Sequence, residues 1–156
     1  MKEEEKIVTF SKDKFLNEGF YKITMDEIAS GLRMSKKTIY KYFPSKDKLV
    51  YSVVKFFQSI IQKKINNIIE SDINSILKIK KLTNVFMEIS LTISSKMLND
   101  LRTHRPDYWQ DIENFRTNLI EKTWLSIFDQ GKREGYIVDY PSEIMVHVFL
   151  NAMRGV

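Results

Sequence analysis

The 156-residue chain contains no cysteine, and this single absence removes several classes of protein. Without a thiol there is no disulfide framework, no cysteine nucleophile, and no thiolate site for zinc or an iron–sulfur cluster. A chain that needs no disulfides suits a reducing compartment, so the sequence favours a cytoplasmic location.

Long apolar runs are also missing. No stretch approaches the roughly 18 apolar residues that a membrane-spanning helix needs, and the first ten residues, MKEEEKIVTF, lack the apolar core of a signal peptide. Hydrophobic residues nevertheless make up 43% of the chain, which is enough to form a buried core. We therefore expect a folded, soluble protein without a membrane partner.

Signatures of catalysis are the third absence. The sequence has no HExxH pair and no glycine-rich phosphate loop. Its two histidines, His104 and His147, stand far apart and lack the neighbouring ligands that a metal site requires. We therefore expect no enzymatic activity, no metal and no cofactor.

Apolar residues recur at helical rather than alternating spacing, which predicts an all-α fold. Ile7, Ser11 and Phe15 would face inward from a first helix, over about 4–18, that Gly19 closes as a C-cap. Further helices are expected from Thr24, from Ser35, and over about 46–70, 74 to the 90s, 94–103, 107 to 131 or 135, and 143–156.

The stretch 24–48 holds two closely joined helix starts. Thr24 and Glu27 have the spacing of a capping box, and Ser35 is a favoured N-cap. Only Arg33 and Met34 separate the end of the first helix from this second cap, so the two helices are expected to cross steeply. This arrangement is a helix-turn-helix, whose second helix is free to enter a DNA groove.

Positive charge concentrates in the same stretch. Residues 33–48 hold six basic residues and one acid, whereas the whole chain has a net charge of +5. A basic cluster is the electrostatic footprint of phosphate-backbone binding, although an isolated cluster is more often a solvated face. Its coincidence with a helix-turn-helix favours double-stranded DNA as the partner.

The amino-terminal half of the second helix supplies the candidate base contacts, because that half meets the base edges in this geometry. Lysine donates to guanine O6 and N7, and Thr or Tyr donates to bases or phosphates. Residues at helix starts favour phosphate through free N–H groups. These arguments select Thr24, Ser35, Lys36, Lys37, Thr38, Tyr40, Lys41 and Lys46 as candidates.

The ordered pattern ITMDEIASGLRMSKKTIYKYFPSKDKL resembles the DNA-binding segment of the TetR family of bacterial transcriptional regulators. The resemblance covers about the first third of the chain and extends back to Phe15 and Gly19. It implies that Lys36, Lys37, Thr38 and Tyr40 face DNA and that Tyr42 and Lys46 contact phosphates.

One residue departs from the family pattern. Arg33 takes the turn position where the family usually has glycine. If the backbone there is left-handed, arginine costs roughly 1 kcal/mol relative to glycine.

The resemblance implies two domains: a helix-turn-helix DNA-binding domain over 1–48, and a helical domain over 49–156 for ligand binding and dimerisation. It also implies a pocket for a small apolar or cationic effector, although an aromatic stripe at helical spacing is more often ordinary core. The pocket candidates are Phe86, Met97, Tyr108, Phe115 and Trp124.

The last expected helix carries a stripe that is too apolar for a helix facing solvent. Family dimers form from the last two helices of each subunit, and only one of that pair is present, so the chain looks truncated. We expect a homodimer built on this helix and on a further one. The stripe consists of Ile144, Met145, Val148, Phe149, Ala152 and Met153.

Taken together, these features predict a transcriptional regulator that binds a palindromic operator as a dimer. A repressor released by its ligand is the first interpretation, with activation left open. The alternative is a helical DNA-binding or protein-interaction module that senses no ligand. Loss of DNA binding on adding a ligand would separate the two.

Overall fold

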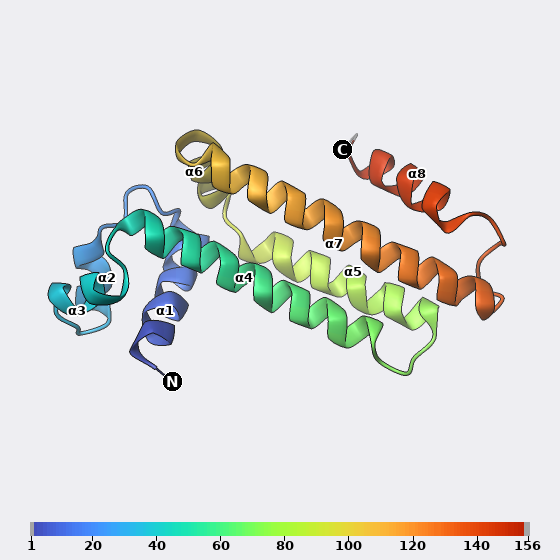
Figure 1. Ribbon diagram of the computed structural model, residues 1–156, viewed down its shortest axis with the longest axis horizontal. Helices are drawn as coiled ribbons and strands as arrows, with labels where there is room; N and C mark the ends of the chain where they lie inside the picture. The colour runs from blue at the N-terminus through green and yellow to red at the C-terminus, as the bar shows by residue number, and fades with distance from the viewer. Residues whose placement is uncertain (1, 155–156) are drawn as a thin grey trace. The chain divides into compact units, whose positions relative to one another are not determined.

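The computed structural model describes residues 2–154, which form eight α-helices and no strand, so the all-α prediction is confirmed (Figure 1). The chain divides into two compact units. The first comprises Met1–Ile60 and Ile89–Ile112, and the second comprises Ile61–Glu88 and Glu113–Val156. Within residues 2–154, no helix is both long and apolar enough to cross a membrane.

The first unit is built around the amino-terminal helices. Its elements are α1 (Glu3–Glu18), α2 (Met25–Gly31), α3 (Lys36–Tyr42), the first part of α4 (Lys46–Ile69), the end of α5 (Ser75–Thr92), α6 (Ser95–His104) and the start of α7 (Pro106–Arg133).

Local capping residues set several of these bounds. Thr24 and Glu27 make the predicted capping box at the start of α2. Ser35 and Ser94 cap α3 and α6 with hydroxyls that accept backbone N–H bonds. Gly19 closes α1 with a φ of 77°, a backbone conformation that residues other than glycine rarely adopt. The predicted helix starts and the predicted C-cap are therefore confirmed.

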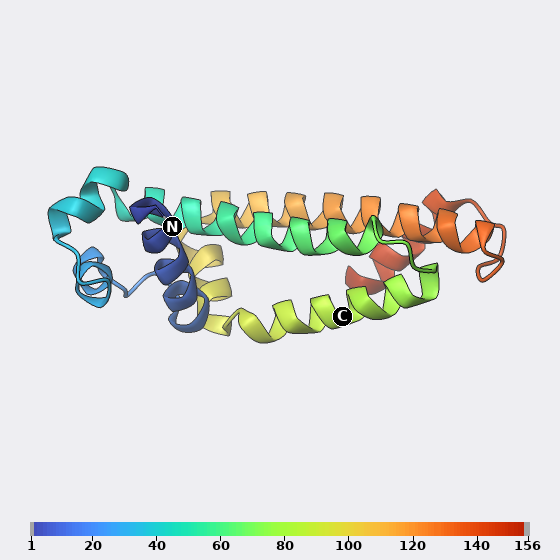
Figure 2. The same ribbon diagram turned by 90° about the horizontal axis from the view of Figure 1, so that it is seen from below.

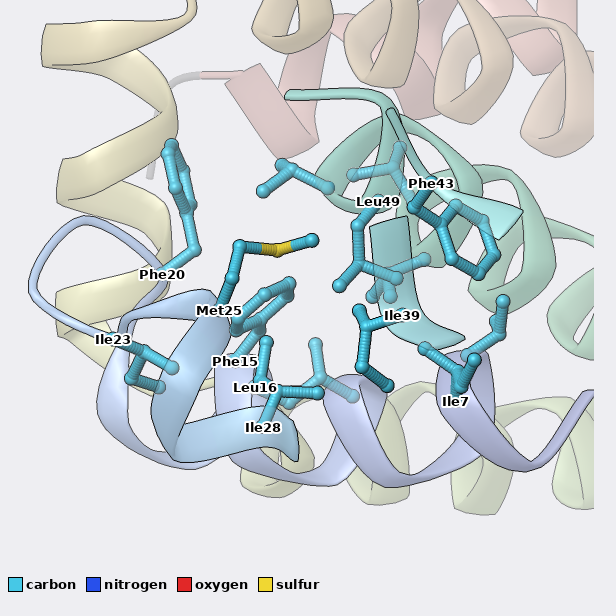
Figure 3. Packing of buried hydrophobic residues seen from close by; sticks show 14 of the residues in the cluster. Ile7, Phe15, Leu16, Phe20, Ile23, Met25, Ile28, Ile39, Phe43 and Leu49 are labelled. Atoms are coloured by element: carbon cyan, nitrogen blue, oxygen red, sulfur yellow. The ribbon is translucent and has the colours of Figure 1, made fainter. Parts of the chain in front are cut away.

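One hydrophobic core joins α1, α2, α3 and α4. Ile7 and Phe15 from α1, Ile28 from α2, Ile39 from α3 and Leu49 from α4 are all fully buried (Figure 3). Each such side chain contributes roughly 1.5–3 kcal/mol by burial. The core extends past residue 48 and includes side chains from α6, so the unit that carries the helix-turn-helix is larger than the segment 1–48. The functional boundary at residue 48 stays a prediction.

The second unit consists of the later part of α4, most of α5 and α7, and α8 (Ser142–Arg154). In this unit α4 and α7 lie in one layer and α5 in another (Figure 2). Two hydrogen bonds attach the start of α5 and the loop before it to the end of α7. The Glu134 carboxylate accepts the Ser75 N–H at 2.8 Å, and the Gln130 side chain donates to the Ile73 carbonyl at 2.8 Å. The buried side chains Ile65, Leu82 and Ile127 come from three different helices.

Helix α8 buries only part of its apolar surface. Val146 and Leu150 are buried, whereas Ile144 is 49% exposed and Val148 is 64% exposed. Met145 is half-buried. The side chains of Phe149, Ala152 and Met153, which complete the predicted stripe, lie outside those that the structure describes.

Candidate DNA-binding surface

Helices α2 and α3 are joined by a tight turn centred on Arg33. The Arg33 N–H donates to the Ser30 carbonyl at 3.0 Å, and the Met34 N–H donates to the Ala29 carbonyl at 2.9 Å. Arg33 has a φ of 53°, so the turn is left-handed there despite the absence of glycine. These bonds satisfy carbonyls at the end of α2 and reverse the chain. The helix-turn-helix is present, with arginine in a conformation that glycine adopts more readily.

Helix α3 has one buried face and one exposed face. Ile39 and Phe43 are buried. Among the candidate DNA contacts, Lys36, Lys37, Tyr40 and Lys41 are exposed, and Tyr40 is 41% exposed although it is a large aromatic side chain. Thr38 and Tyr42 are half-buried. The core therefore fixes α3 from behind and leaves a basic, hydroxyl-bearing surface outside.

Lys36 is held by an acid from the preceding helix. Its ammonium lies 2.7 Å from Asp26 Oδ1 and donates to Asp26 Oδ2 at 2.9 Å. Both side chains are more than half exposed. The hydrogen bond and the charge of Asp26 raise the pKa of Lys36, so the lysine is fully charged at neutral pH.

Tyr42, at the last position of α3, is bound by an acid from α1. Its hydroxyl donates to Glu3 Oε2 at 2.8 Å, and this bond raises the pKa of the phenol. The Lys41 ammonium lies 5.6 Å from the centre of the Tyr42 ring. Two predicted DNA contacts, at the two ends of α3, are therefore each paired with a carboxylate from another helix.

Two of the predicted hydroxyl contacts, Thr24 and Ser35, act as helix caps in this structure. The Thr24 hydroxyl accepts the Glu27 N–H at 3.2 Å and donates to Glu27 Oε2 at 2.9 Å. Hydrogen bonds from Thr24 lower the pKa of Glu27. The hydroxyls of Ser35 and Thr38 lie 2.8 Å apart, and Ser35 also accepts the Thr38 N–H at 3.0 Å.

Lys46 differs from the other candidate lysines because it is half-buried and binds the chain itself. Its ammonium donates to the Tyr21 carbonyl at 2.6 Å, and burial lowers its pKa. The Tyr21 N–H donates to Asp100 of α6 at 2.8 Å, and the Tyr21 ring stacks on His104 with centroids 3.7 Å apart. Lys46 thus helps to fix the loop that connects α1 to α2.

Sequence patterns singled out neither Asp26 nor Glu3 as a partner of a residue on α3. Both pairs link different helices, over ten residues in one case and 39 in the other. Only the packing of α1 and α2 against α3 brings the partners together. The one available signal was an acid in the first turn of α2 within a basic helix-turn-helix.

The five predicted effector-binding residues do not belong to one unit. Met97 is buried in the core of the first unit, and Tyr108 packs against that core while its hydroxyl donates to the Asp47 carbonyl at 3.3 Å. Phe86, Phe115 and Trp124 belong to the second unit. Trp124 is buried, and the other two are half-buried.

The second unit contains a cavity of about 420 Å³ between α4 and α7. Phe115 is the one predicted residue among its lining side chains. The lining carries one cation and three side-chain amides, and none of its residues is acidic. The lining consists of Gln62, Asn66, Ile69, Phe115, Asn118, Leu119, Lys122 and Thr123.

Comparison with known proteins shows that this chain is similar to bacterial transcriptional regulators. Residues 12–53 match the model of the bacterial regulatory proteins of the tetR family. The uncharacterized HTH-type transcriptional regulator YvaF of Bacillus subtilis is 26% identical over 140 residues, which are 87% of this chain and 72% of that protein.

Two solved structures show the same similarity in three dimensions. A transcriptional regulator from Cytophaga hutchinsonii superposes with a TM-score of 0.74 at 25% identity, over 96% of this chain and 79% of that one. A TetR transcriptional regulator from Legionella pneumophila superposes with a TM-score of 0.74 at 15% identity, over 99% of this chain and 84% of that one. The latter likeness concerns the fold alone.

Proposed function

Because the chain is a member of the TetR family of bacterial regulatory proteins, we propose that it is a ligand-responsive repressor that binds a palindromic operator as a dimer. The chain is a transcriptional regulator and not an enzyme. The proposal concerns how it reads DNA, what it senses and how two copies act together.

The observation that carries the proposal is the exposed face of α3. Lys36, Lys37, Tyr40 and Lys41 lie outside, while Ile39 and Phe43 anchor the helix from the opposite side. A short rigid helix with basic and hydroxyl side chains suits major-groove readout, because lysine donates to guanine O6 and N7. Tyr42 supports phosphate contact from the carboxyl end of α3, and Lys46 does so from the start of α4.

The cavity between α4 and α7 supports an effector site in the second unit. Its volume of about 420 Å³ falls in the range of small-molecule sites. Lys122 is its only charged lining residue, so a cationic effector would meet a like charge with no carboxylate to offset it. Phe115 and Leu119 offer an apolar wall. We therefore narrow the effector to a neutral or anionic molecule with an apolar body.

A dimer is supported by the apolar surface of α8. Ile144 and Val148 remain exposed on a helix whose other face packs against the unit. A single recognition helix covers few base pairs, so useful specificity requires two of them about one turn of DNA apart, roughly 34–36 Å.

Sedimentation of the chain with and without operator DNA measures how many copies bind one operator. Two copies per operator support the proposal, and one copy on an asymmetric site contradicts it.

The effector proposal is tested by thermal-shift measurements with matched ligands. A medium-chain fatty acid, its methyl ester and the corresponding alkylamine share one apolar body and differ in charge. We expect the acid or ester to raise the melting temperature and the amine to have no effect. The same ligands are then added to the protein–DNA complex. Stabilisation with release of DNA supports a ligand-responsive repressor, whereas stabilisation by none of them favours a DNA-binding module without ligand sensing.

A further inference from the structure

We infer that Asp26 is a positioning residue that makes Lys36 selective for bases over phosphates. The inference rests on the proposed DNA-binding function and adds a specificity determinant to it. It starts from the pair between Asp26, in the first turn of α2, and Lys36, the first residue of α3, with Nζ to carboxylate distances of 2.7 and 2.9 Å.

The pair has little to do with holding the fold together. The two side chains are 58% and 64% exposed, and ion pairs this accessible to water contribute little to stability. The segment between them is already fixed by the turn bonds around Arg33 and by the buried side chains Ile28 and Ile39. The main consequence of the pair is therefore where it places the Lys36 ammonium.

An ammonium has three N–H donors, so a lysine held by one carboxylate can still donate to a base. Asp26 restricts the long, flexible stem of Lys36 before DNA arrives. A restricted lysine loses less rotamer entropy when it meets guanine O6 or N7 in the correct register. In that register the pair is retained, and Asp26 imposes no penalty.

On non-specific DNA the same carboxylate acts against binding. Lys36 cannot swing freely toward the nearest phosphate without leaving Asp26. The pair therefore lowers, by roughly one, the number of positively charged side chains that neutralise phosphates on non-specific DNA. Because specificity is a difference between two affinities, weakening the wrong complex raises it as effectively as strengthening the right one.

Asp26→Asn tests the inference without removing the lysine. The probes are a duplex selected by the wild-type protein from a random pool and a scrambled duplex of equal length and composition. For the scrambled duplex we expect a roughly five- to tenfold gain in affinity at 0.1 M salt and a salt slope steeper by about 0.9. Affinity for the selected duplex should change much less, so the ratio of the two affinities falls.

Asp13→Asn is the matched control, because it removes the same charge from α1, where Asp13 pairs with Lys12 rather than with a predicted DNA contact. This control should leave the affinity ratio unchanged. In a Lys36→Ala background, Asp26→Asn should also leave the ratio unchanged, because the positioned side chain is gone.

An unchanged affinity ratio in Asp26→Asn overturns the inference, and so does an equal fall of that ratio in Asp13→Asn. A thermal melt accompanies each variant, and equal loss of both affinities together with a lowered melting temperature would also overturn it by assigning Asp26 a structural role. Failure of the wild-type protein to enrich any duplex is a different result, since it refutes the proposed function itself.

Discussion

The starts of α3 and α4 carry the same local sequence, a capping serine followed by lysine, but the two lysines have different surroundings. Lys36 follows Ser35 and stands exposed beside Asp26. Lys46 follows Ser45 and reaches back to the Tyr21 carbonyl from a half-buried position. The local pattern specifies where a helix begins. The role of the lysine is decided by what packs next to that helix start.

The largest expected effect comes from removing the lysines at the start of α3, which are predicted to face the bases. Lys36→Ala combined with Lys37→Ala should abolish preference for the selected duplex over the scrambled one, because good base contacts each supply roughly tenfold or more of discrimination. Melting temperature should stay close to that of the wild type, since both lysines are exposed. Fluorescence anisotropy with the two duplexes measures the preference. Retention of the full preference would remove α3 from base readout.

Lys46→Ala removes the corresponding lysine at the start of α4. It should weaken binding to every duplex and reduce the salt slope by about 1. It should also lower the free energy of unfolding by about 1 kcal/mol, because a hydrogen bond to the Tyr21 carbonyl is lost from a partly exposed site. Lys48→Ala is the control, since Lys48 is exposed. If both variants unfold alike, the Lys46 bond has no measurable structural role.

Glu3→Gln probes the carboxyl end of α3. Glu3 holds the Tyr42 hydroxyl that is predicted to contact phosphate. Removing its charge should strengthen binding to selected and scrambled duplexes alike, by roughly two- to fivefold at low salt. Glu4→Gln removes the same charge from the neighbouring residue and should have a smaller effect. A change in the ratio of the two affinities would show that this end of α3 also reads sequence.

Arg33→Gly tests the backbone conformation of the turn that positions α3. Because Arg33 has a φ of 53°, glycine should raise the free energy of unfolding by roughly 1 kcal/mol. Chemical denaturation measures the gain. Lys6→Gly, in the regular helix α1, should lower stability by a similar amount. A loss of stability in Arg33→Gly would mean that the arginine side chain contributes more than its backbone conformation costs.

The smallest expected effect is the pH dependence of the cap that begins α2. Bonds from Thr24 lower the pKa of Glu27, so this carboxylate stabilises the folded state above its unfolded pKa near 4.5. The stabilisation should be lost as pH falls through the lower, folded value. In Glu27→Gln, melting temperatures measured between pH 3 and pH 6 should depend less on pH. An unchanged pH profile would mean that other carboxylates dominate acid unfolding.

Much of the fold could be predicted because helix ends are encoded locally. Capping residues such as Thr24, Ser35 and Gly19 act on backbone groups within a few positions, so their effect is visible in a short window of sequence. The division of α3 into a buried and an exposed face likewise follows from helical spacing. Ile39 and Phe43 stand four positions apart, and both are buried.

Partners across helices could not be predicted in the same way. The Lys36–Asp26 and Tyr42–Glu3 pairs depend on how helices pack, and periodicity does not report which side chains of two faces meet. The effector residues show the same limit. Met97 and Phe115 are both apolar residues on helix faces, but one is buried in the core of the first unit and the other lines a cavity in the second. An apolar face predicts burial without identifying what covers it.

The central claim is that the exposed face of α3 reads a particular DNA sequence, and selection from a random duplex pool tests it most directly. The wild-type chain is incubated with the pool at about 0.15 M salt, and bound duplexes are sequenced over successive rounds. We predict enrichment of one inverted repeat whose half-sites are centred about one helical turn apart. Recovered duplexes that match the input pool, with affinity that depends only on length and salt, would contradict the claim.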